Sequence, residues 1–434
     1  MNKQILLSLI FLLIFGCSFN KDSKFWSNTE TVSNEKVINF EEVYPKEESL
    51  KKEFNSDLKI TLDNKKFNKN NNNYNHNKDS LFNYLGDLQK SSRYSFKKIK
   101  NFHQYEPEIS FFENEIIFFD NIGSILRFNE NSKLVWKKNY YNKSQKKLNP
   151  ILQFANNGRF LVVADNIAKY YMIDINSGNL VWSKDNLAPF NSQIKIFKDK
   201  FFIVDFSNTL RCFSLKDGQE LWNIKTENSL IRSQKKLSIV IDDKYVYFNN
   251  SIGDISAVDL NKGELIWQIP TQSSLIYEST FSLETSDIIV DKNYLFFSNN
   301  KNRLFSINTE IGSIAWENKI NSNIRSVVIE NYLFSISQEG YFIVTEKTSG
   351  NIIRVNDVFK NFSIKQRKNI KPTGFVVSKD KIFISTSNGK LLTVDINTGK
   401  TVSTLKISNN KISRPFVKNE NLFLIKDNAI IKLN

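Results

Sequence analysis

The sequence contains few of the residues that carry redox, metal and nucleophilic chemistry. Its 434 residues include two Cys, two His and two Met. His76 and His103 both precede the repeats that begin near residue 108, so no His-based metal cluster or catalytic dyad can form within those repeats. G-x-S-x-G, P-loop and HExxH elements are also missing. These absences predict a protein that is not an enzyme and that binds no metal and no cofactor.

Glycine is scarce as well, with 14 residues, whereas Phe alone accounts for 36. Aromatic residues make up 13% of the chain, and residues of this kind suit the half-buried surfaces of β-sheets. The composition therefore favours an all-β fold with a substantial core. The formal charge of +15 comes from Lys residues spread along the chain rather than gathered on one segment. We expect weak attraction to anionic lipid or acidic partners and no specific binding of nucleic acid.

The N-terminus carries an export signal. Lys3 precedes an apolar stretch of eleven residues, 5–15, interrupted only by Ser8. This stretch is too short to span a bilayer, which needs about 20 residues, but it suits a signal peptide over residues 1–16. It ends in Ile14-Phe15-Gly16-Cys17, which resembles the lipobox of bacterial lipoproteins.

The lipobox resemblance implies that Cys17 is lipidated and becomes the mature N-terminus, and Ser18 after it favours anchoring in the outer membrane, on its periplasmic face. The alternative is an ordinary cleaved signal followed by an incidental Cys. With Cys17 modified, no intramolecular disulfide can form, and Cys212 is expected to be a small hydrophobic residue of the core.

Residues 17–90 have the composition of a flexible tether. They are rich in Asn and Lys, including four consecutive Asn at 70–73. Such a segment buries too little apolar surface to offset the entropy of ordering. A flexible chain of roughly 70 residues has an r.m.s. span of about 45 Å, enough to hold a domain clear of a membrane surface.

From about residue 108 a Gly-x-x-x-Trp element recurs every 38–49 residues. Its tryptophans are Trp136, Trp182, Trp222, Trp267 and Trp316, and the copy that ends at Trp136 has Ser132 in place of the Gly. Two degenerate copies place Arg354 and Ser403 in the Trp slot. Identical placement in successive repeats predicts that each Trp packs between neighbouring repeats, because a ligand site does not need a copy in every repeat.

Each period divides into four strands, as residues 374–407 illustrate. Residues 374–378 form the first short strand, and residues 381–387 alternate apolar and polar residues in the second. Asn388-Gly389 is a strong hairpin signal, and 390–396 and 400–407 supply the third and fourth strands. Four antiparallel strands in 40–50 residues are typical of a β-propeller blade. A linear β-solenoid is the competing fold, but its rungs are shorter.

The count of blades follows from closure. Seven full or partial repeats precede residues 414–434, which supply three strands and then end. The segment 93–99 can provide the fourth strand, so that no edge is left open. The sequence therefore predicts an eight-bladed propeller of four-stranded antiparallel blades over residues 91–434, closed by pairing of its N- and C-terminal strands.

The Gly-x-x-x-Trp repeat resembles the quinoprotein-type (PQQ-like) repeat. Two branches of that group are candidates, the quinoprotein dehydrogenases and the BamB-like propeller lipoproteins of outer-membrane protein assembly. The layout resembles the second branch in its lipobox, its short blades and its ending within the last blade. Dehydrogenases need a Ca²⁺ site, a general base and, in many, adjacent cysteines. This chain has no vicinal Cys pair and no long inserted loop.

The resemblance to BamB implies docking on the periplasmic domains of the barrel-inserting protein, through loops around the third to fifth blades. An aliphatic-x-aliphatic-Arg patch corresponds to 229–232. Ile231 and Arg232 match it, with Leu230 between the aliphatic positions and Ser229 in place of the first aliphatic. In a later acidic loop Glu284 matches one acid and Ser282 replaces the other. The alternative is that 229–232 is an ordinary surface loop.

A different class of function is a generic periplasmic binding module for another envelope protein or a cell-wall ligand, since propellers carry many functions. An apolar patch near Ile231 would favour barrel assembly, whereas a deep polar central pocket would favour a small-ligand module. Edge strands could also accept a client strand. In each case we expect a monomeric propeller that works within a complex.

Overall fold

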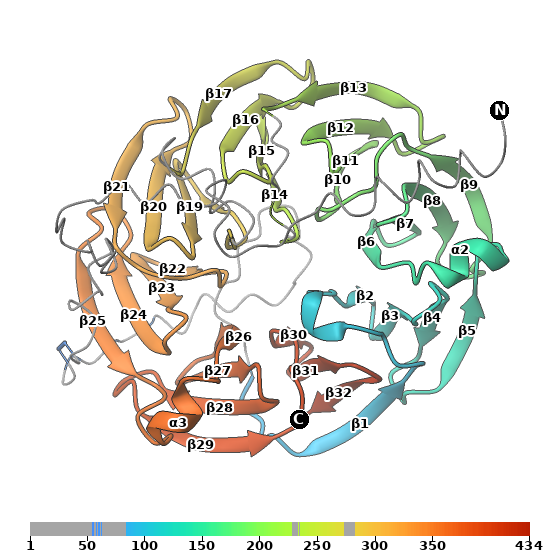
Figure 1. The fold of residues 1–434 in the computed structure, drawn as a ribbon. Helices are drawn as coiled ribbons and strands as arrows, with labels where there is room; N and C mark the ends of the chain where they lie inside the picture. The colour runs from blue at the N-terminus through green and yellow to red at the C-terminus, as the bar shows by residue number, and fades with distance from the viewer. Residues whose placement is uncertain are drawn as a thin grey trace, which may run out of the picture. The chain divides into compact units, whose positions relative to one another are not determined.

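The computed structural model describes residues 54, 55, 58, 60, 62, 84–227, 233, 235–272 and 283–434. Within this part of the chain, eight four-stranded antiparallel sheets stand around a common axis. Figure 1 shows the ring, with the first strand of each blade near the centre and the last at the perimeter. The predicted eight-bladed propeller is confirmed, and a linear solenoid is ruled out because the sheets close into a circle.

The first four blades follow one another along the chain. Their strands are β2 (Ser110–Phe112), β3 (Glu115–Phe119), β4 (Ile125–Phe128) and β5 (Leu134–Lys138) in blade one, β6 (Leu152–Asn156), β7 (Phe160–Asp165), β8 (Lys169–Asp174) and β9 (Leu180–Asp185) in blade two, β10 (Lys195–Phe197), β11 (Lys200–Val204), β12 (Thr209–Ser214) and β13 (Glu220–Lys225) in blade three, and β14 (Ile239–Ile241), β15 (Tyr245–Asn249), β16 (Ile255–Asp259) and β17 (Leu265–Ile269) in blade four.

The remaining blades complete the circle. Their strands are β18 (Ile289–Asp291), β19 (Tyr294–Asn299), β20 (Arg303–Asn308) and β21 (Ile314–Asn318) in blade five, β22 (Val327–Ile329), β23 (Tyr332–Ile336), β24 (Tyr341–Glu346) and β25 (Ile352–Asp357) in blade six, β26 (Pro372–Val377), β27 (Lys381–Thr386), β28 (Lys390–Asp395) and β29 (Thr401–Lys406) in blade seven, and β30 (Phe416–Lys418), β31 (Asn421–Lys426), β32 (Ala429–Leu433) and β1 (Lys90–Ser95) in blade eight.

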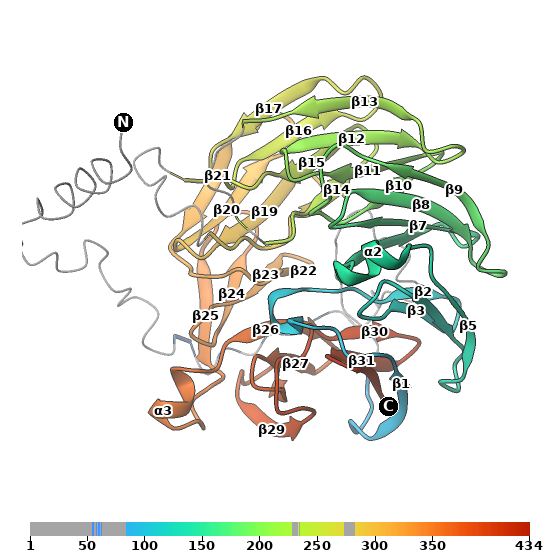
Figure 2. The same ribbon diagram turned by 45° about the vertical axis from the view of Figure 1, so that its right-hand side comes forward.

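Within the described part of the chain, short helices occupy three connectors. They are η2 (Phe102–Gln104), α2 (Lys143–Lys147) and α3 (Ile364–Arg367). Figure 2 shows α2 between blades one and two and α3 beyond the end of β25. No helix among the described residues is long and apolar enough to cross a membrane.

Blade eight combines the two ends of the described chain. Its outer strand β1 pairs antiparallel with β32, with Tyr94 opposite Ile430. The pairing extends to Gln89 and Asn434, whose backbone N–H groups each donate to the other's carbonyl at 3.1 Å. A Cβ on Gly86 would overlap the backbone of Asn434, so glycine permits this close approach. The sequence places the closing strand at 93–99, and in the structure it is Lys90–Ser95.

The core lies between the blades. The second and third strands of each sheet are buried on both faces because each blade is covered by two neighbours, as in β7 and β8. The outermost strands carry mainly exposed and half-buried residues, as in β9, except β25, which has three buried residues. Cys212 on β12 is fully buried, and burial raises the pKa of its thiol to about 12. It is a core residue, as the sequence predicts.

Each repeat Trp contacts the next blade. The indole Nε1 of Trp136 donates to Ile175 O at 3.0 Å, and those of Trp182, Trp267 and Trp316 donate to the equivalent carbonyls of Leu215, Thr309 and Lys347. The ring also covers the Gly of the next repeat. A Cβ on Gly312, whose φ is +67°, would lie 2.5 Å from the ring of Trp267. The repeat Gly thus has two roles: it adopts the left-handed backbone conformation of the turn, and its lack of a side chain leaves room for the indole ring.

Blade six replaces Trp with Arg354, which is fully buried. Its Nη1 donates to Ile396 O at 3.0 Å, the carbonyl that corresponds to Lys347 O in the preceding contact. The same nitrogen donates to Leu58 O at 3.0 Å. Nearby, Phe54 exchanges backbone hydrogen bonds with Val355, both 3.1 Å long. A buried guanidinium therefore links blade six, blade seven and a residue far upstream.

Blade seven has exposed Ser403 in the Trp slot, and Tyr84 fills the missing aromatic position. The ring of Tyr84 meets that of Phe383 at 5.1 Å between centroids, as Trp316 meets the corresponding Phe296 at 6.0 Å. Ser378 Oγ donates to Tyr84 O at 2.5 Å. Tyr84 is fully buried, and burial raises the pKa of its hydroxyl to about 12. Residue 84 is therefore part of the ring.

Tyr84→Ala should destabilise the propeller by about 3 kcal/mol, the usual cost of truncating a buried aromatic side chain. Tyr84→Phe keeps the ring and is expected to stay within about 1 kcal/mol of wild type. Chemical denaturation of the purified protein measures both. Equal stability of the Ala and Phe variants would contradict the role given to the Tyr84 ring.

Candidate functional site

Two features of one face of the ring are candidates for function. In each four-stranded blade the connectors between blades end on one face and the hairpins between first and second strands lie on the other, because successive strands are antiparallel. The connectors that enter blades four and five carry the residues of the predicted partner site. Connectors that enter several blades also bring charged side chains to the axis.

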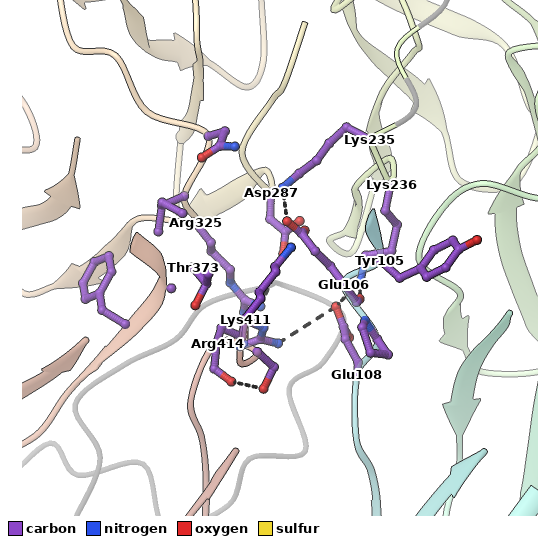
Figure 3. A pocket seen from close by; sticks show the side chains of 16 residues that line it. Tyr105, Glu106, Glu108, Lys235, Lys236, Asp287, Arg325, Thr373, Lys411 and Arg414 are labelled. Atoms are coloured by element: carbon purple, nitrogen blue, oxygen red, sulfur yellow. Dashed lines mark hydrogen bonds and ion pairs between the residues drawn. The ribbon is translucent and has the colours of Figure 1, made fainter. Parts of the chain in front are cut away.

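The second feature is called the central pocket here. Its lining comes from connectors and first strands of blades one, four, five, six, seven and eight, as Figure 3 shows. The lining residues are Tyr105, Glu106, Pro107, Glu108, Lys235, Lys236, Asp287, Asn323, Ile324, Arg325, Thr373, Gly374, Phe375, Lys411, Ser413 and Arg414.

The connector of blade one reaches across the axis to blade four. Lys235 Nζ forms an ion pair and a hydrogen bond with Glu106 Oε1. Lys236 Nζ donates to Glu108 Oε1 at 2.8 Å and to Glu106 O at 3.0 Å. Both lysines are largely buried, with side chains 11% and 9% exposed. Because blades one and four are not neighbours, these pairs join elements that no blade-to-blade contact connects.

Further polar contacts join blades three, five, six and eight. Gln193 Nε2 donates to Asp287 Oδ2 at 3.0 Å, and Arg325 Nη1 lies 3.7 Å from the same oxygen. Arg414 Nη2 lies 4.0 Å from Glu108 Oε1. The axis is thus lined by a network of charges.

Cations outnumber acids in this network. Around the pocket the cations are Lys195, Lys235, Lys236, Arg325, Lys411 and Arg414, and the acids are Glu106, Glu108 and Asp287.

Burial and the neighbouring charges together shift the pKa values of these groups. Burial alone would raise the pKa of Glu106, but Lys235 and Lys411 lower it to about 2. Glu108 likewise has its pKa held well below the usual range, since Lys236 and Arg414 outweigh its burial. Burial lowers the pKa of Lys195 to about 7, and neighbouring Arg325 adds to the effect. Burial also lowers the pKa of Lys411.

The partner site predicted from the sequence is only partly described. Leu230, Ile231 and Arg232 lie outside the described residues. Glu284 is exposed, and its carboxylate accepts a hydrogen bond from Asn323 Nδ2. Its backbone N–H donates to Asn300 Oδ1 at 3.0 Å.

The two connectors that carry the predicted partner residues contact each other at residues that the structure describes. Ser233, which follows Arg232 in the chain, donates from Oγ to Leu283 O at 2.6 Å. Leu283 directly precedes Glu284 and is buried. The connector that leaves blade three and the one that leaves blade four are therefore in contact at residues adjacent to the predicted partner residues.

Sequence reasoning missed the central pocket. Each connector contributes only one or two charged residues to the pocket, such as Lys235-Lys236. These residues do not recur at a regular spacing in the sequence that would predict a shared site. Glu106 and Glu108, two residues apart in an extended segment, share a side, which is the one available local signal. Among the described residues no group of three or more His, Cys, Asp and Glu side chains could hold a metal ion.

The fold and the Trp–Gly contact between blades define a quinoprotein-type propeller. Residues 121–356 match the family model described as outer membrane protein assembly factor BamB, and the chain belongs to this family. No curated protein matches the sequence.

Solved structures that resemble the chain share its fold at low identity. BamB from Moraxella catarrhalis has a TM-score of 0.65 and 14% identity over 80% of this chain and 99% of that one. The computationally designed Ika8 protein has a TM-score of 0.59 and 13% identity, over 79% of this chain and 99% of that one. The quinohemoprotein alcohol dehydrogenase from Comamonas testosteroni has a TM-score of 0.60 and 8% identity, over 82% of this chain and 78% of that one.

The low pKa of Glu106 predicts a dependence of stability on acid. Its folded-state value of about 2 lies below the ordinary 4.5, so its stabilising effect is present above pH 4.5 and is lost as the pH falls toward 2. Glu106→Gln should lower the stability of the protein at pH 7 and reduce the loss of stability between pH 4.5 and pH 2. Denaturant midpoints from pH 2.5 to 7 measure the effect, with Glu310→Gln on an exposed turn as the control. Parallel curves for wild type and Glu106→Gln would refute the assignment.

Proposed function

We propose that this protein is a non-enzymatic scaffold lipoprotein of the outer-membrane β-barrel assembly complex. It docks on the periplasmic domains of the barrel-inserting protein through the connectors around blades three to five. Membership of the BamB family supports the role. The contact between Ser233 and Leu283 supports a single docking surface, since it joins the connectors that carry Arg232 and Glu284.

Two observations support a role without catalysis. The sequence has no vicinal Cys pair. Despite their burial, Glu106 and Glu108 have their pKa values lowered by neighbouring cations, to about 2 for Glu106. A general base works best when its pKa lies near the working pH, so these acids are poorly suited to that task. A quinoprotein dehydrogenase is therefore not the function that we propose.

A second candidate is a periplasmic binding module for another envelope protein or a cell-wall ligand. The pocket on the axis favours this candidate, because polar groups that converge on one cavity can fix the orientation of a bound ligand. The two functions are compatible, since the predicted docking residues Arg232 and Glu284 are not among those that line the pocket, although the same connectors carry both sets.

Arg232→Glu should abolish docking, because a charge reversal at the proposed arginine anchor places like charges or an unpaired charge in the interface. The test is co-purification from mild detergent of a chain tagged at its C-terminus, with partners identified by mass spectrometry. Arg159→Glu is the matched control, since exposed Arg159 lies in the β6–β7 hairpin on the opposite face. We expect a large outer-membrane barrel protein with wild type and the control, and its loss with Arg232→Glu.

Recovery of that barrel protein with all three chains would retain the assembly role and reject the docking site. If wild type recovers no barrel protein, the assembly role itself is wrong, and the binding module becomes the leading candidate.

Cys17→Ser should move the protein from the outer-membrane fraction to the soluble periplasmic fraction, because the lipid on Cys17 is the proposed anchor. Density-gradient fractionation and immunoblotting measure the distribution, with Cys212→Ser as the control. A Cys17→Ser protein that stays in the membrane fraction would reject lipidation as the anchor.

A further inference from the structure

A segment far upstream of the first blade is attached to blade six. Phe54 and Val355 exchange two backbone hydrogen bonds, both 3.1 Å long, which form an antiparallel bridge at the outer edge of β25. The side chain of Arg354 in the same strand donates to Leu58 O at 3.0 Å. A tryptophan in this slot would offer a single N–H, whereas arginine has donors both for the next blade and for Leu58. Residues 54–62 are called the upstream segment here.

Apolar side chains of the upstream segment join the core between blades six and seven. Ile60 is buried and belongs to the same hydrophobic cluster as Phe359 and Ile370, which lie on the connector between these blades. Leu62 and Phe362 are partly buried against that cluster. The upstream segment and the connector therefore share a core, and release of the segment would expose apolar surface to water.

The bridge at Phe54 determines where the chain that leads to the proposed lipid anchor meets the ring. Between Cys17 and Phe54 there are about 36 residues, which for the predicted tether composition give an r.m.s. span of about 33 Å. With the first attachment at Tyr84 instead, the span would be about 45 Å. Blades six and seven are therefore the side of the ring that is nearest to the proposed anchor along the chain.

The connector between blades six and seven presents a basic surface. Residues 358–371 contain no Asp or Glu and five basic residues, which are Lys360, Lys365, Arg367, Lys368 and Lys371. The four lysines are exposed, and Arg367 pairs with Asp357 at 2.7 Å. Ile364, the first residue of α3, is 79% exposed although it is aliphatic. The connector thus combines positive charge with an apolar side chain that is open to solvent.

A capping box holds α3 in place. Ser363 Oγ accepts a hydrogen bond from Gln366 N at 3.4 Å, and Gln366 Oε1 accepts one from Ser363 N at 3.1 Å. Figure 2 shows that α3 lies beyond the end of β25. Lysines near a bilayer are attracted to anionic headgroups, and an exposed aliphatic side chain is stabilised when it enters the headgroup region. Charge and apolar side chain together fit an anionic lipid surface.

The helix α2 resembles α3 in composition but differs from it in position. It carries Lys143, Lys146 and Lys147, and Leu148 at its end is 61% exposed. It lies on the connector between blades one and two, whereas the upstream segment is attached to blade six. The position of the attachment, rather than composition alone, therefore distinguishes α3 from α2.

We propose that the connector of residues 358–371 is a membrane-facing surface, which binds anionic lipid headgroups through Lys365 and Lys368 and inserts Ile364 among them. The upstream segment directs this surface toward the membrane in which the chain is anchored. This inference rests on the membrane anchoring in the proposed function and not on docking to the barrel-inserting protein. The predicted docking residues Arg232 and Glu284 belong to other connectors, so the two contacts use different parts of the ring.

The test uses the mature chain from residue 18 with a hexahistidine tag in place of Cys17, bound to vesicles that contain a nickel-chelating lipid. An environment-sensitive fluorophore is attached through Ile364→Cys on α3 or Leu148→Cys beside α2, and Cys212 stays unlabelled because it is fully buried. We expect the fluorescence at 364 to rise about twofold when the vesicles contain phosphatidylglycerol, because the probe leaves water for the headgroup region. Position 148, or vesicles of phosphatidylcholine, should give no such rise.

Ile60→Asn should release the upstream segment and lower the rise at 364 to the level at 148, because it places an amide in the shared core. Leu58→Asn is the matched control, since the Leu58 side chain is 40% exposed and contributes its backbone carbonyl to the contact. An Ile60→Asn protein that keeps the full rise would overturn the directing role of the segment.

If Ile60→Asn does not fold, the double variant Lys365→Gln with Lys368→Gln provides the second test. It should weaken the contact about fivefold for each lysine removed, whereas Lys143→Gln with Lys147→Gln on α2 should leave the signal unchanged.

Equal responses at 364 and 148, an undiminished rise on phosphatidylcholine, or equal effects of the two double variants would overturn the membrane-facing surface. The tag replaces the lipid, so this result does not depend on whether Cys17 is lipidated. Failure of the proposed anchor is detected separately by the fractionation of Cys17→Ser.

Discussion

The ring depends on the contact in which one blade's outer strand covers the turn of the next blade. An indole N–H donates to a turn carbonyl while the ring lies on glycine, as Trp267 does with Thr309 and Gly312. The contact satisfies a buried polar group and excludes water from the space between two sheets. A blade cannot bury its own faces alone, so a repeated contact between blades determines the stability of the whole circle. In blade three Trp222 packs on Gly263, but its Nε1 has no hydrogen-bond partner among the described residues.

The exceptions to this contact show how the upstream chain is joined to the ring. Arg354 supplies the donor that Trp supplies elsewhere, and the same side chain binds Leu58 O. Tyr84 supplies the aromatic ring that blade seven lacks, and β1 completes blade eight. The two blades that lack the repeat Trp, blades six and seven, are therefore among the blades that residues upstream of the first repeat contact. The segment between the proposed lipid anchor and the blades therefore contributes core residues.

Local signals made the blades predictable. The spacing of Trp136 to Trp316, the hairpin at Asn388-Gly389 and the alternation along the strands are each contained within one repeat, and the count of eight followed from the need to close the last blade. Tyr84 could not be predicted, because its partner Ser378 lies 294 residues away. The central pocket could not be predicted for the same reason, since Lys235 and Glu106 are 129 residues apart in the sequence. Of the predicted partner residues only Glu284 is described, and the sequence could not show that its connector meets Ser233.

The docking connectors and the central pocket share one face, so a partner bound to the connectors would lie near the mouth of the axis. Whether that partner is the barrel-inserting protein is tested most directly by a photo-reactive amino acid at position 231, cross-linked in living cells. We expect one product with the periplasmic domains of the barrel-inserting protein, and none from position 159 on the opposite face. Equal products from both positions, or a product with an unrelated envelope protein only, would contradict it.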